Sequence, residues 1–291
     1  MSQTARAKLA QGDAEAHKAA TRTFLWSRSD VWESAVEAYT KAGAEFRVID
    51  EDNEAAAAFH KAADIQKDQL DSALDAASNY QECFKLYRKG NPEKAVECQT
   101  HAIDIYLRES PRRAGNLLEA RGQFRETEIG DIPAALQDYE AAAKIFDRET
   151  NSQALANKLW LKVAEIAAIE GDYFKAIENF EKVAASAVSN NLLKWSVKEY
   201  FLKAGLCHLA SGDMVATNRA FAKYRDMDPT FPSTREHQLL IDLAEAVQAG
   251  DQEMFADKLF KYDQISKLDK WKTTILLKIK NAIEDAGEDF S

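Results

Sequence analysis

The stretch "GDYFKAIENFEKVA", residues 171–184, carries the signals that decide the fold. Asp172 is a short acidic residue of the type that caps a helix start, and Gly171 before it suits the end of a preceding helix. The apolar residues that follow are spaced as on one face of a helix: Phe174, Ile177, Phe180 and Val183. The stretch therefore predicts a helix with one buried face, entered through a tight turn.

The same pattern returns about every forty residues, in "GNPEKAVECQTHAI" (90–103) and "GDIPAALQDYEAAA" (130–143). Residues suited to N-caps recur along the chain with gaps of 18 to 23: Asp30, Asp52, Asp71, Asn91, Ser110, Asp131, Asn151, Asp172, Asn190, Asp213, Ser233 and Asp251. Two helices per repeat predict an all-α fold, a solenoid of antiparallel helical hairpins that resembles tetratricopeptide repeats and forms a twisted sheet. A compact helix bundle with chance periodicity is the alternative.

The repeat pattern changes near the end of the sequence. "LDKWKTTILLKIKNAIED", residues 268–285, has a broad apolar stripe typical of a helix packed in a small bundle. We therefore expect residues 1–232 to form the hairpins and residues 233–291 to form a C-terminal helical bundle with an acidic tail.

Composition restricts the classes of function. The 291 residues include 48 acidic and 38 basic ones, and a net charge of −10 argues against general binding to nucleic acid. The three scattered cysteines contain no C-x-x-C pair, which favours a reducing cytosol over a disulfide framework. Because no segment has the length and apolarity of a membrane span, a cytoplasmic protein with peripheral membrane association is expected.

Catalytic motifs are not found in the sequence. The five histidines have no metal-binding spacing, and neither a phosphate-binding glycine loop nor a nucleophile elbow occurs. We therefore expect no metal, no cofactor and no enzyme activity. A repeat fold without a catalytic constellation favours a binding scaffold.

Charge differs between alternate helices. The segment 131–147 holds four acids and one lysine, whereas alternate helices carry the basic residues Arg112, Arg113, Lys158, Lys162, Lys194, Lys198 and Lys203. Alternate helices line one face of a solenoid, so these residues are candidates for a basic strip that binds an acidic partner. A solvated face with scattered lysines is the alternative.

Several stretches resemble the soluble NSF attachment proteins, the alpha-SNAP family. They are "YDQISKLDKWKTTILLKIKNAIEDAGEDFS" (262–291), "NKLWLKVAEIAAIEGDYFKAIENFEKV" (157–183) and "NNLLKWSVKEYFLKAGLCH" (190–208). The resemblance implies a non-catalytic adaptor that wraps the four-helix SNARE bundle and recruits NSF, a hexameric AAA+ ATPase that disassembles it in vesicle trafficking. A peptide-binding scaffold or co-chaperone of the tetratricopeptide type is the alternative.

The resemblance also implies site residues. The SNARE-binding candidates are Arg112, Arg113, Asn116, Lys158, Lys162, Leu192, Lys194, Trp195 and Lys198, of which Asn116 departs from a basic family position. The candidates that would bind the ATPase are Asp213, Glu284, Asp285, Glu288, Asp289 and Phe290, where phenylalanine replaces a family leucine.

The stretch "TRTFLWSRSDVW", residues 21–32, places Phe24, Leu25 and Trp26 side by side. Family members carry a hydrophobic membrane-contacting loop between their first two helices, and the resemblance implies this role for the three residues. The alternative is a hydrophobic staple that fixes the start of the second helix.

Overall fold

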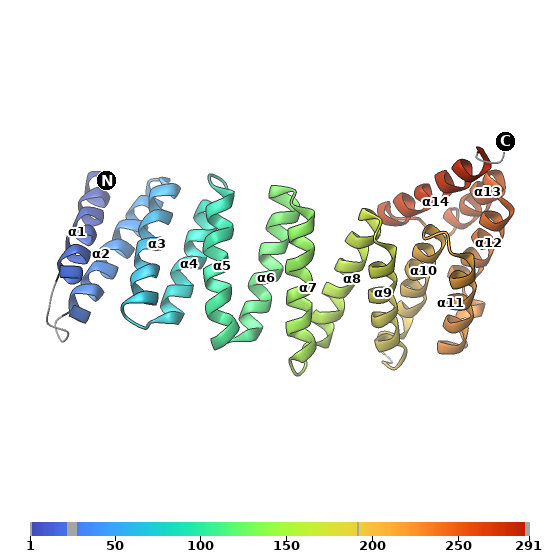
Figure 1. Cartoon of the computed structure of the whole chain (residues 1–291), viewed down its shortest axis with the longest axis horizontal. Helices are drawn as coiled ribbons and strands as arrows, with labels where there is room; N and C mark the ends of the chain where they lie inside the picture. The colour runs from blue at the N-terminus through green and yellow to red at the C-terminus, as the bar shows by residue number, and fades with distance from the viewer. Residues whose placement is uncertain (1, 22–27, 191, 289–291) are drawn as a thin grey trace. The chain divides into compact units, whose positions relative to one another are not determined.

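The computed structural model describes residues 2–21, 28–190 and 192–288, and for residues 284–288 it describes the backbone alone. Within those ranges every regular element is helical, and fourteen α-helices follow one another through short connections (Figure 1). The expected all-α fold of helical hairpins is confirmed. The chain packs as two compact units, residues 1–150 and residues 151–291.

In the first unit, each helix packs against the next along the chain, as expected for stacked antiparallel hairpins. Its helices are α1 (Ser2–Thr21), α2 (Arg28–Val48), α3 (Asp52–Asp68), α4 (Ala73–Tyr87), α5 (Pro92–Glu109), α6 (Pro111–Phe124), the short π-helix η2 (Arg125–Ile129) and α7 (Ile132–Arg148).

In the second unit, α8, α9 and α10 pack in sequence, and the C-terminal helix α14 returns to pack against α10 and α8. Its helices are α8 (Gln153–Glu170), α9 (Tyr173–Val188), α10 (Lys194–Ala210), α11 (Met214–Met227), the 3₁₀ turn η3 (Phe231–Ser233), α12 (Arg235–Ala249), α13 (Gln252–Asp263) and α14 (Lys270–Glu288).

Side-chain caps begin five helices where the sequence predicted them. In each, a carboxylate or amide oxygen accepts a hydrogen bond of 2.8–3.2 Å from the backbone N–H three residues later. The five capping residues are Asn91, Asp131, Asp172, Asp213 and Asp251. These caps satisfy N–H groups that have no partner inside their own helix.

Ser110 occupies its predicted N-cap position before Pro111, although its side chain makes no capping hydrogen bond. The remaining predicted caps need correction, and Thr234 caps α12 in place of Ser233. Asp71 and Asn151 adopt positive φ angles of 50° and 62° in the connections, so the helices begin just after them. The remaining misplaced candidates are Asp30, Asp52 and Asn190.

Small residues let the helices approach closely. Ala95, Ala135 and Ala176, which recur at equivalent positions of the repeat, are fully buried. In the second unit, a Cβ atom placed on Gly205 of α10 would lie 2.6 Å from Leu240 Cδ1 of α12. A larger residue at position 205 would force the Leu240 side chain to shift.

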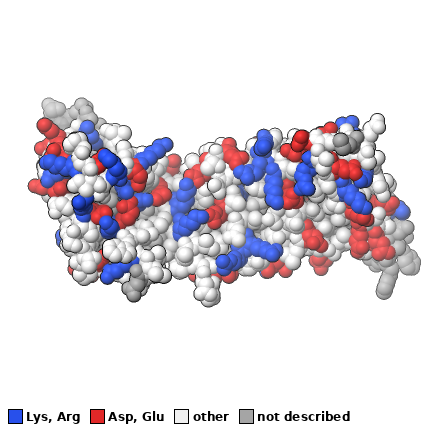
Figure 2. All heavy atoms as spheres, turned by 180° about the vertical axis from the view of Figure 1, so that it is seen from behind, with Lys and Arg blue, Asp and Glu red and all other residues white. Residues whose placement is uncertain are grey.

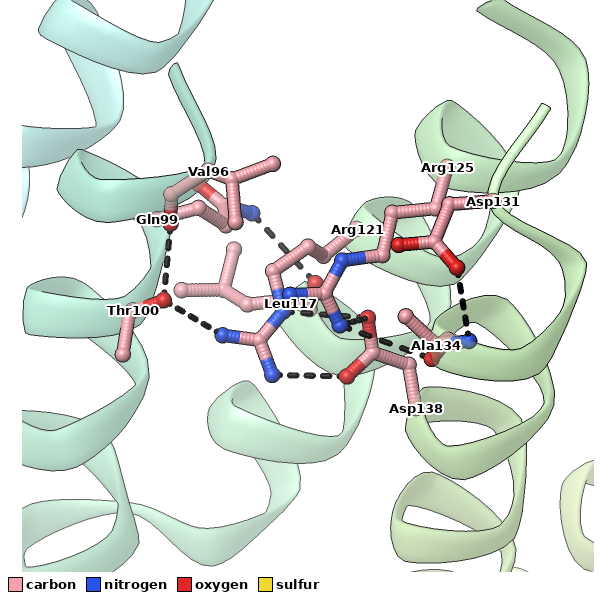
Figure 3. A network of polar contacts seen from close by, with 9 residues as sticks. All are labelled: Val96, Gln99, Thr100, Leu117, Arg121, Arg125, Asp131, Ala134 and Asp138. Carbon is pink, nitrogen blue, oxygen red and sulfur yellow. Dashed lines mark hydrogen bonds and ion pairs between the residues drawn. The ribbon is translucent and has the colours of Figure 1, made fainter. Parts of the chain in front are cut away.

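A buried ionic network joins α5, α6 and α7 in the first unit (Figure 3). Arg121 donates to both carboxylate oxygens of Asp138, at 3.0 and 2.6 Å, and to Thr100 Oγ1 at 2.6 Å. Arg125 Nη1 donates to the same carboxylate at 2.8 Å, and the Asp138 side chain is only 4% exposed. One carboxylate thus holds two guanidinium groups between neighbouring hairpins.

The boundary expected at residue 232, between the hairpins and the C-terminal bundle, differs from the boundary between the two compact units. The two compact units meet at residues 150 and 151, which divides the chain by how its helices pack. The division into hairpins and a C-terminal bundle stays a prediction.

We expect Asp138→Ala to lower the free energy of unfolding by about 3 kcal/mol, because two largely buried guanidinium groups would lose their counter-charge. Chemical denaturation followed by circular dichroism measures this. Lys41→Ala is the control, since its pair with Glu37 is exposed and should be worth less than about 0.5 kcal/mol. Equal effects of the two substitutions would contradict the prediction.

Candidate functional site

Helix α14 is fastened to α8 through backbone carbonyl groups. Trp271 Nε1 donates to the carbonyl oxygen of Glu165 at 3.0 Å, and Lys278 Nζ donates to that of Ile169 at 2.5 Å. Ile169 lies in the last turn of α8, where carbonyl groups have no partner within the helix. Lys278 therefore provides a hydrogen-bond donor for a carbonyl group at the C-terminal end of α8.

Charged side chains also link α8, α10 and α14 near Glu165. Lys203 Nζ of α10 lies 2.6 Å from Glu165 Oε1 and 5.2 Å from the centre of the Trp271 ring. Lys272 of α14 pairs with Glu199 of α10 at 2.6 Å. Helix α14 thus contacts the C-terminal half of α8 at Glu165 and Ile169, and α10 at Glu199 in its second turn.

The N-terminal half of α8 and the first turn of α10 precede these contacts. On α8, Lys158 and Lys162 precede Glu165 at steps of four and three residues, so the three share one stripe. On α10, Trp195 lies one turn before Glu199. Lys158 and Trp195 are exposed, and Lys162 is half-buried. Basic and aromatic side chains from two helices are therefore presented where α14 does not reach.

Two large apolar side chains are almost fully solvated here. Leu192, just before α10, is 88% exposed, and Trp195 in its first turn is 86% exposed. Neither contributes to the buried core of the second unit. Exposed tryptophan beside basic residues is a composition found at protein interfaces.

A pocket of about 470 Å³ lies beside the start of α10. Its lining residues are Lys194, Trp195, Lys198, Asp228, Thr230, Ser233 and Thr234. Asp228 is buried, and it accepts hydrogen bonds from the backbone N–H and the hydroxyl of Thr230 at 2.9 and 2.7 Å. The structure thus brings three of the predicted site residues to one concave place.

Lys198 has an internal role as well. Its Nζ lies 2.9 Å from Glu236 Oε1, and Glu236 is buried at the start of α12. Reversing the charge of Lys198 would place two carboxylates together. Lys194, which is exposed, is the better residue for testing the charge of this surface.

In the first unit, the predicted residues Arg112, Arg113 and Asn116 are all exposed in the first two turns of α6. The guanidinium of Arg113 lies 5.6 Å from the centre of the Tyr106 ring of α5. The stacking orients Arg113 while its charge stays in solvent.

Asp213, predicted to bind the ATPase, is exposed and caps α11 by accepting from Ala216 N at 2.9 Å. Its neighbours Gly212 and Met214 belong to the lining of an apolar pocket of about 650 Å³. That lining also includes Ile279 and Ile283 of α14. An acidic residue and an apolar hollow thus lie at the same end of the second unit.

Other predicted residues fall outside what the structure describes. These are Phe24, Leu25 and Trp26, the side chains of Glu284, Asp285 and Glu288, and residues Asp289 and Phe290. Their roles stay predictions. Nearby, Arg28 Nε at the start of α2 donates to the carbonyl oxygen of Ala19 at 3.0 Å and fastens α2 to the end of α1.

The charged surface is mixed. Figure 2 shows Lys and Arg side chains interspersed with Asp and Glu on the face opposite that of Figure 1. Among the described residues, no cluster of His, Cys, Asp or Glu is arranged to hold a metal ion. No helix within the described ranges has the length and apolarity to cross a membrane.

The profile of the family described as "Soluble NSF attachment protein, SNAP" matches residues 3–284, almost the whole chain. The chain belongs to the SNAP family. A "Probable vesicular-fusion protein sec17 homolog" of Schizosaccharomyces pombe is 46% identical over 268 residues, which cover 92% of each chain.

Two further SNAP relatives carry the name "Alpha-soluble NSF attachment protein". The one from Saccharomyces cerevisiae is 35% identical over 92% of each chain. The one from Homo sapiens is 36% identical over 91% of this chain and 89% of its own length. The resemblance inferred from residues 157–183, 190–208 and 262–291 is thereby confirmed.

Part of the pocket beside the start of α10 could not be identified from the sequence. Asp228, Thr230, Ser233 and Thr234 come from the segment "DPTFPST", residues 228–234. Its two prolines indicate a connection between helices. Nothing in the segment itself shows that it faces Trp195, because that juxtaposition depends on how α10 and α12 pack.

Proposed function

We propose that this member of the SNAP family is a non-catalytic adaptor that binds assembled SNARE complexes and recruits the NSF ATPase for their disassembly in vesicle trafficking. The observation that carries the proposal is the match to the SNAP family over residues 3–284. Relatives named as vesicular-fusion and NSF attachment proteins support it. In this proposal residues 1–232 form the hairpin sheet and residues 233–291 the C-terminal bundle.

The surface of α8 and α10 suits the proposed SNARE partner. Basic residues such as Lys162 and Lys194 would attract acidic side chains on the outside of a four-helix bundle. Burial of Leu192 and Trp195 would add apolar contacts worth about 1.5–3 kcal/mol for each fully buried side chain. The remaining proposed contacts are Lys158 and Lys198, with Arg112, Arg113 and Asn116 of the first unit.

We also propose which cofactors and partners the protein lacks and where it acts in the cell. The adaptor would need no metal and no cofactor, because ATP would be hydrolysed by the recruited partner. We propose no nucleic-acid partner, since the net charge is −10. The protein would be cytoplasmic and would join membranes peripherally, through its SNARE partner and through Phe24, Leu25 and Trp26.

We expect the double charge reversal Lys162→Glu and Lys194→Glu to weaken binding to a preassembled SNARE complex about tenfold, because charge complementarity at the contact is lost. Binding of the unchanged protein should also weaken with added salt. Pull-down titrations measure both, with circular dichroism to verify folding.

The matched control is the double variant Lys261→Glu and Lys267→Glu. It changes the net charge equally, at exposed lysines whose partners Asp257 and Asp263 lie four residues before them. If the two double variants bind alike, the α8–α10 surface is not the SNARE contact. Equal affinity for a short acidic peptide and for the SNARE complex would favour the peptide-binding alternative.

Deletion of residues 284–291 should preserve SNARE binding but abolish disassembly driven by NSF, because the acidic residues and Phe290 are proposed to contact the ATPase. Disassembly assays with purified NSF test this. The companion variant Asp213→Ser keeps a capping side chain while removing the charge, so it should slow disassembly without loss of stability. Full disassembly by the truncated protein would exclude these residues from the contact.

Replacement of Phe24, Leu25 and Trp26 by serine should leave disassembly in detergent unchanged and slow it on liposomes. The proposed membrane contact acts as a second tether, and removing it lowers effective concentration without altering protein contacts. Parallel assays in detergent and on liposomes measure the difference. If the three residues form a staple instead, the variant should melt at a lower temperature. Disassembly should then slow equally in detergent and on liposomes.

A further inference from the structure

The pocket beside the start of α10 has two walls of different chemistry. The first two turns of α10 form one wall, with Lys194, Trp195 and Lys198. The connection between α11 and α12 forms the other, the acceptor wall, which consists of Asp228, Thr230, Ser233 and Thr234. The hydrogen-bonding groups of the acceptor wall indicate which kind of side chain the pocket suits.

The three hydroxyl groups of the acceptor wall use their hydrogens within the connection itself. Thr230 Oγ1 donates to Asp228 Oδ1 at 2.7 Å. Ser233 Oγ donates to the carbonyl oxygen of Thr230, and Thr234 Oγ1 donates to that of Phe231, both at 2.7 Å. Because a hydroxyl group has one hydrogen to donate, these oxygens can only accept from a further ligand.

Asp228 adds a negative charge to this wall. The residue is only 7% exposed, and both of its hydrogen bonds, from the backbone N–H and the hydroxyl of Thr230, end on Oδ1. Its Oδ2 accepts from no donor within the described residues, although the atom still reaches solvent. A carboxylate buried to this extent is stabilised by further donors. The pocket that Asp228 lines is where such a donor has room to enter.

The two lysines of the opposite wall do not supply that donor. Lys198 Nζ pairs with Glu236 Oε1 at 2.9 Å, and no ion pair joins Lys194 to Asp228 in the described part of the chain. The charges of Lys194 and Lys198 are balanced by those of Asp228 and Glu236. The surroundings of the pocket are therefore close to neutral, and a cation is not excluded by the net charge.

Trp195 selects the shape of the donor. Its side chain is 86% exposed, so the faces of the indole ring are open to a ligand. Aromatic faces attract cations, and a planar guanidinium can stack on them while its N–H groups stay available for hydrogen bonds. An ammonium group lacks this planar shape. A guanidinium thus suits both the aromatic ring and the acceptor wall.

We propose that this pocket receives an arginine side chain of the protein partner, with the guanidinium stacked on Trp195 and donating to Asp228 Oδ2. The oxygens of Thr230 and Ser233 accept from its remaining N–H groups. The inference rests on the proposed function for the identity of the partner, an assembled SNARE complex. Lysines such as Lys162 attract acidic side chains around the pocket, and the single arginine fixes the position of the partner along α10.

The first test needs no partner protein. The full-length chain is titrated with the methylamides of N-acetyl-arginine, N-acetyl-lysine and N-acetyl-glutamate, and the indole N–H signal of Trp195 is followed by NMR. Comparison with Trp195→Phe assigns that signal. The arginine probe should shift it with saturation at the lowest concentration, followed by the lysine probe, whereas the glutamate probe should leave it unchanged.

The variant Asp228→Asn removes the charge but keeps an oxygen for the two hydrogen bonds from Thr230. It should weaken binding of the arginine probe about tenfold, because a charge-assisted hydrogen bond is lost. The matched control is Asp226→Asn, which changes the same charge at an exposed residue outside the pocket lining. Circular dichroism verifies that both variants are folded.

Lys194→Ala tests the sign of the charge that the pocket prefers. Removing a like charge from the opposite wall should strengthen binding of the arginine probe about twofold. A pocket for a carboxylate would show the reverse, with tighter binding of the glutamate probe in Asp228→Asn and weaker binding in Lys194→Ala.

Binding to a preassembled SNARE complex then tests the source of the arginine. Asp228→Asn should bind the complex more weakly than Asp226→Asn does. Among single Arg→Gln variants of the SNARE complex, one should weaken binding to the unchanged protein but not to Asp228→Asn, because the two substitutions remove the same contact.

The outcomes separate this inference from the proposed function. An arginine probe that binds no better than the glutamate probe, or equal behaviour of Asp228→Asn and Asp226→Asn, would overturn the inference while SNARE binding of the unchanged protein persists. Absence of SNARE binding by the unchanged protein would overturn the proposed function, and with it the SNARE complex as the source of the arginine.

Discussion

The close approach of paired helices is the constraint on which the rest of the structure depends. Each hairpin has an apolar stripe that only its neighbours can cover, and the helices can come near enough only at small residues. Ala95, Ala135 and Ala176 are fully buried at these positions, and Gly205 lies where any Cβ atom would collide with Leu240. Caps such as Asp172 then fix where each helix begins, so the stripes face one another in register.

Polar groups are placed so that this packing leaves few buried charges without a partner. Asp138 binds Arg121 and Arg125 between hairpins of the first unit. In the second unit Glu181 accepts from Lys223 and Tyr224 and meets His208; although burial raises its pKa, these contacts outweigh burial and lower it to about 2. Such networks tie helices that are distant in sequence and restrict how the hairpins can shift.

The proposed binding surface results from what α14 leaves uncovered. Trp271 and Lys278 hold α14 on the C-terminal part of α8, and charged pairs with α10 complete the contact. Lys158 of α8 and Lys194 and Trp195 of α10 stay exposed beside these contacts.

The sequence by itself determined the all-α fold and the family, since helical spacing, cap residues and family-specific stretches are local signals. It also indicated Lys194, Trp195 and Lys198, which lie in one short segment. The broad apolar stripe expected in residues 268–285 is narrower in the structure, where Leu277 of α14 is 57% exposed while Leu276 beside it is buried. Only the tertiary structure brought Asp228 and Thr230 to Trp195 and joined Lys198 to Glu236. These contacts depend on packing between different helices, and no local pattern of residues encodes which side chains meet there.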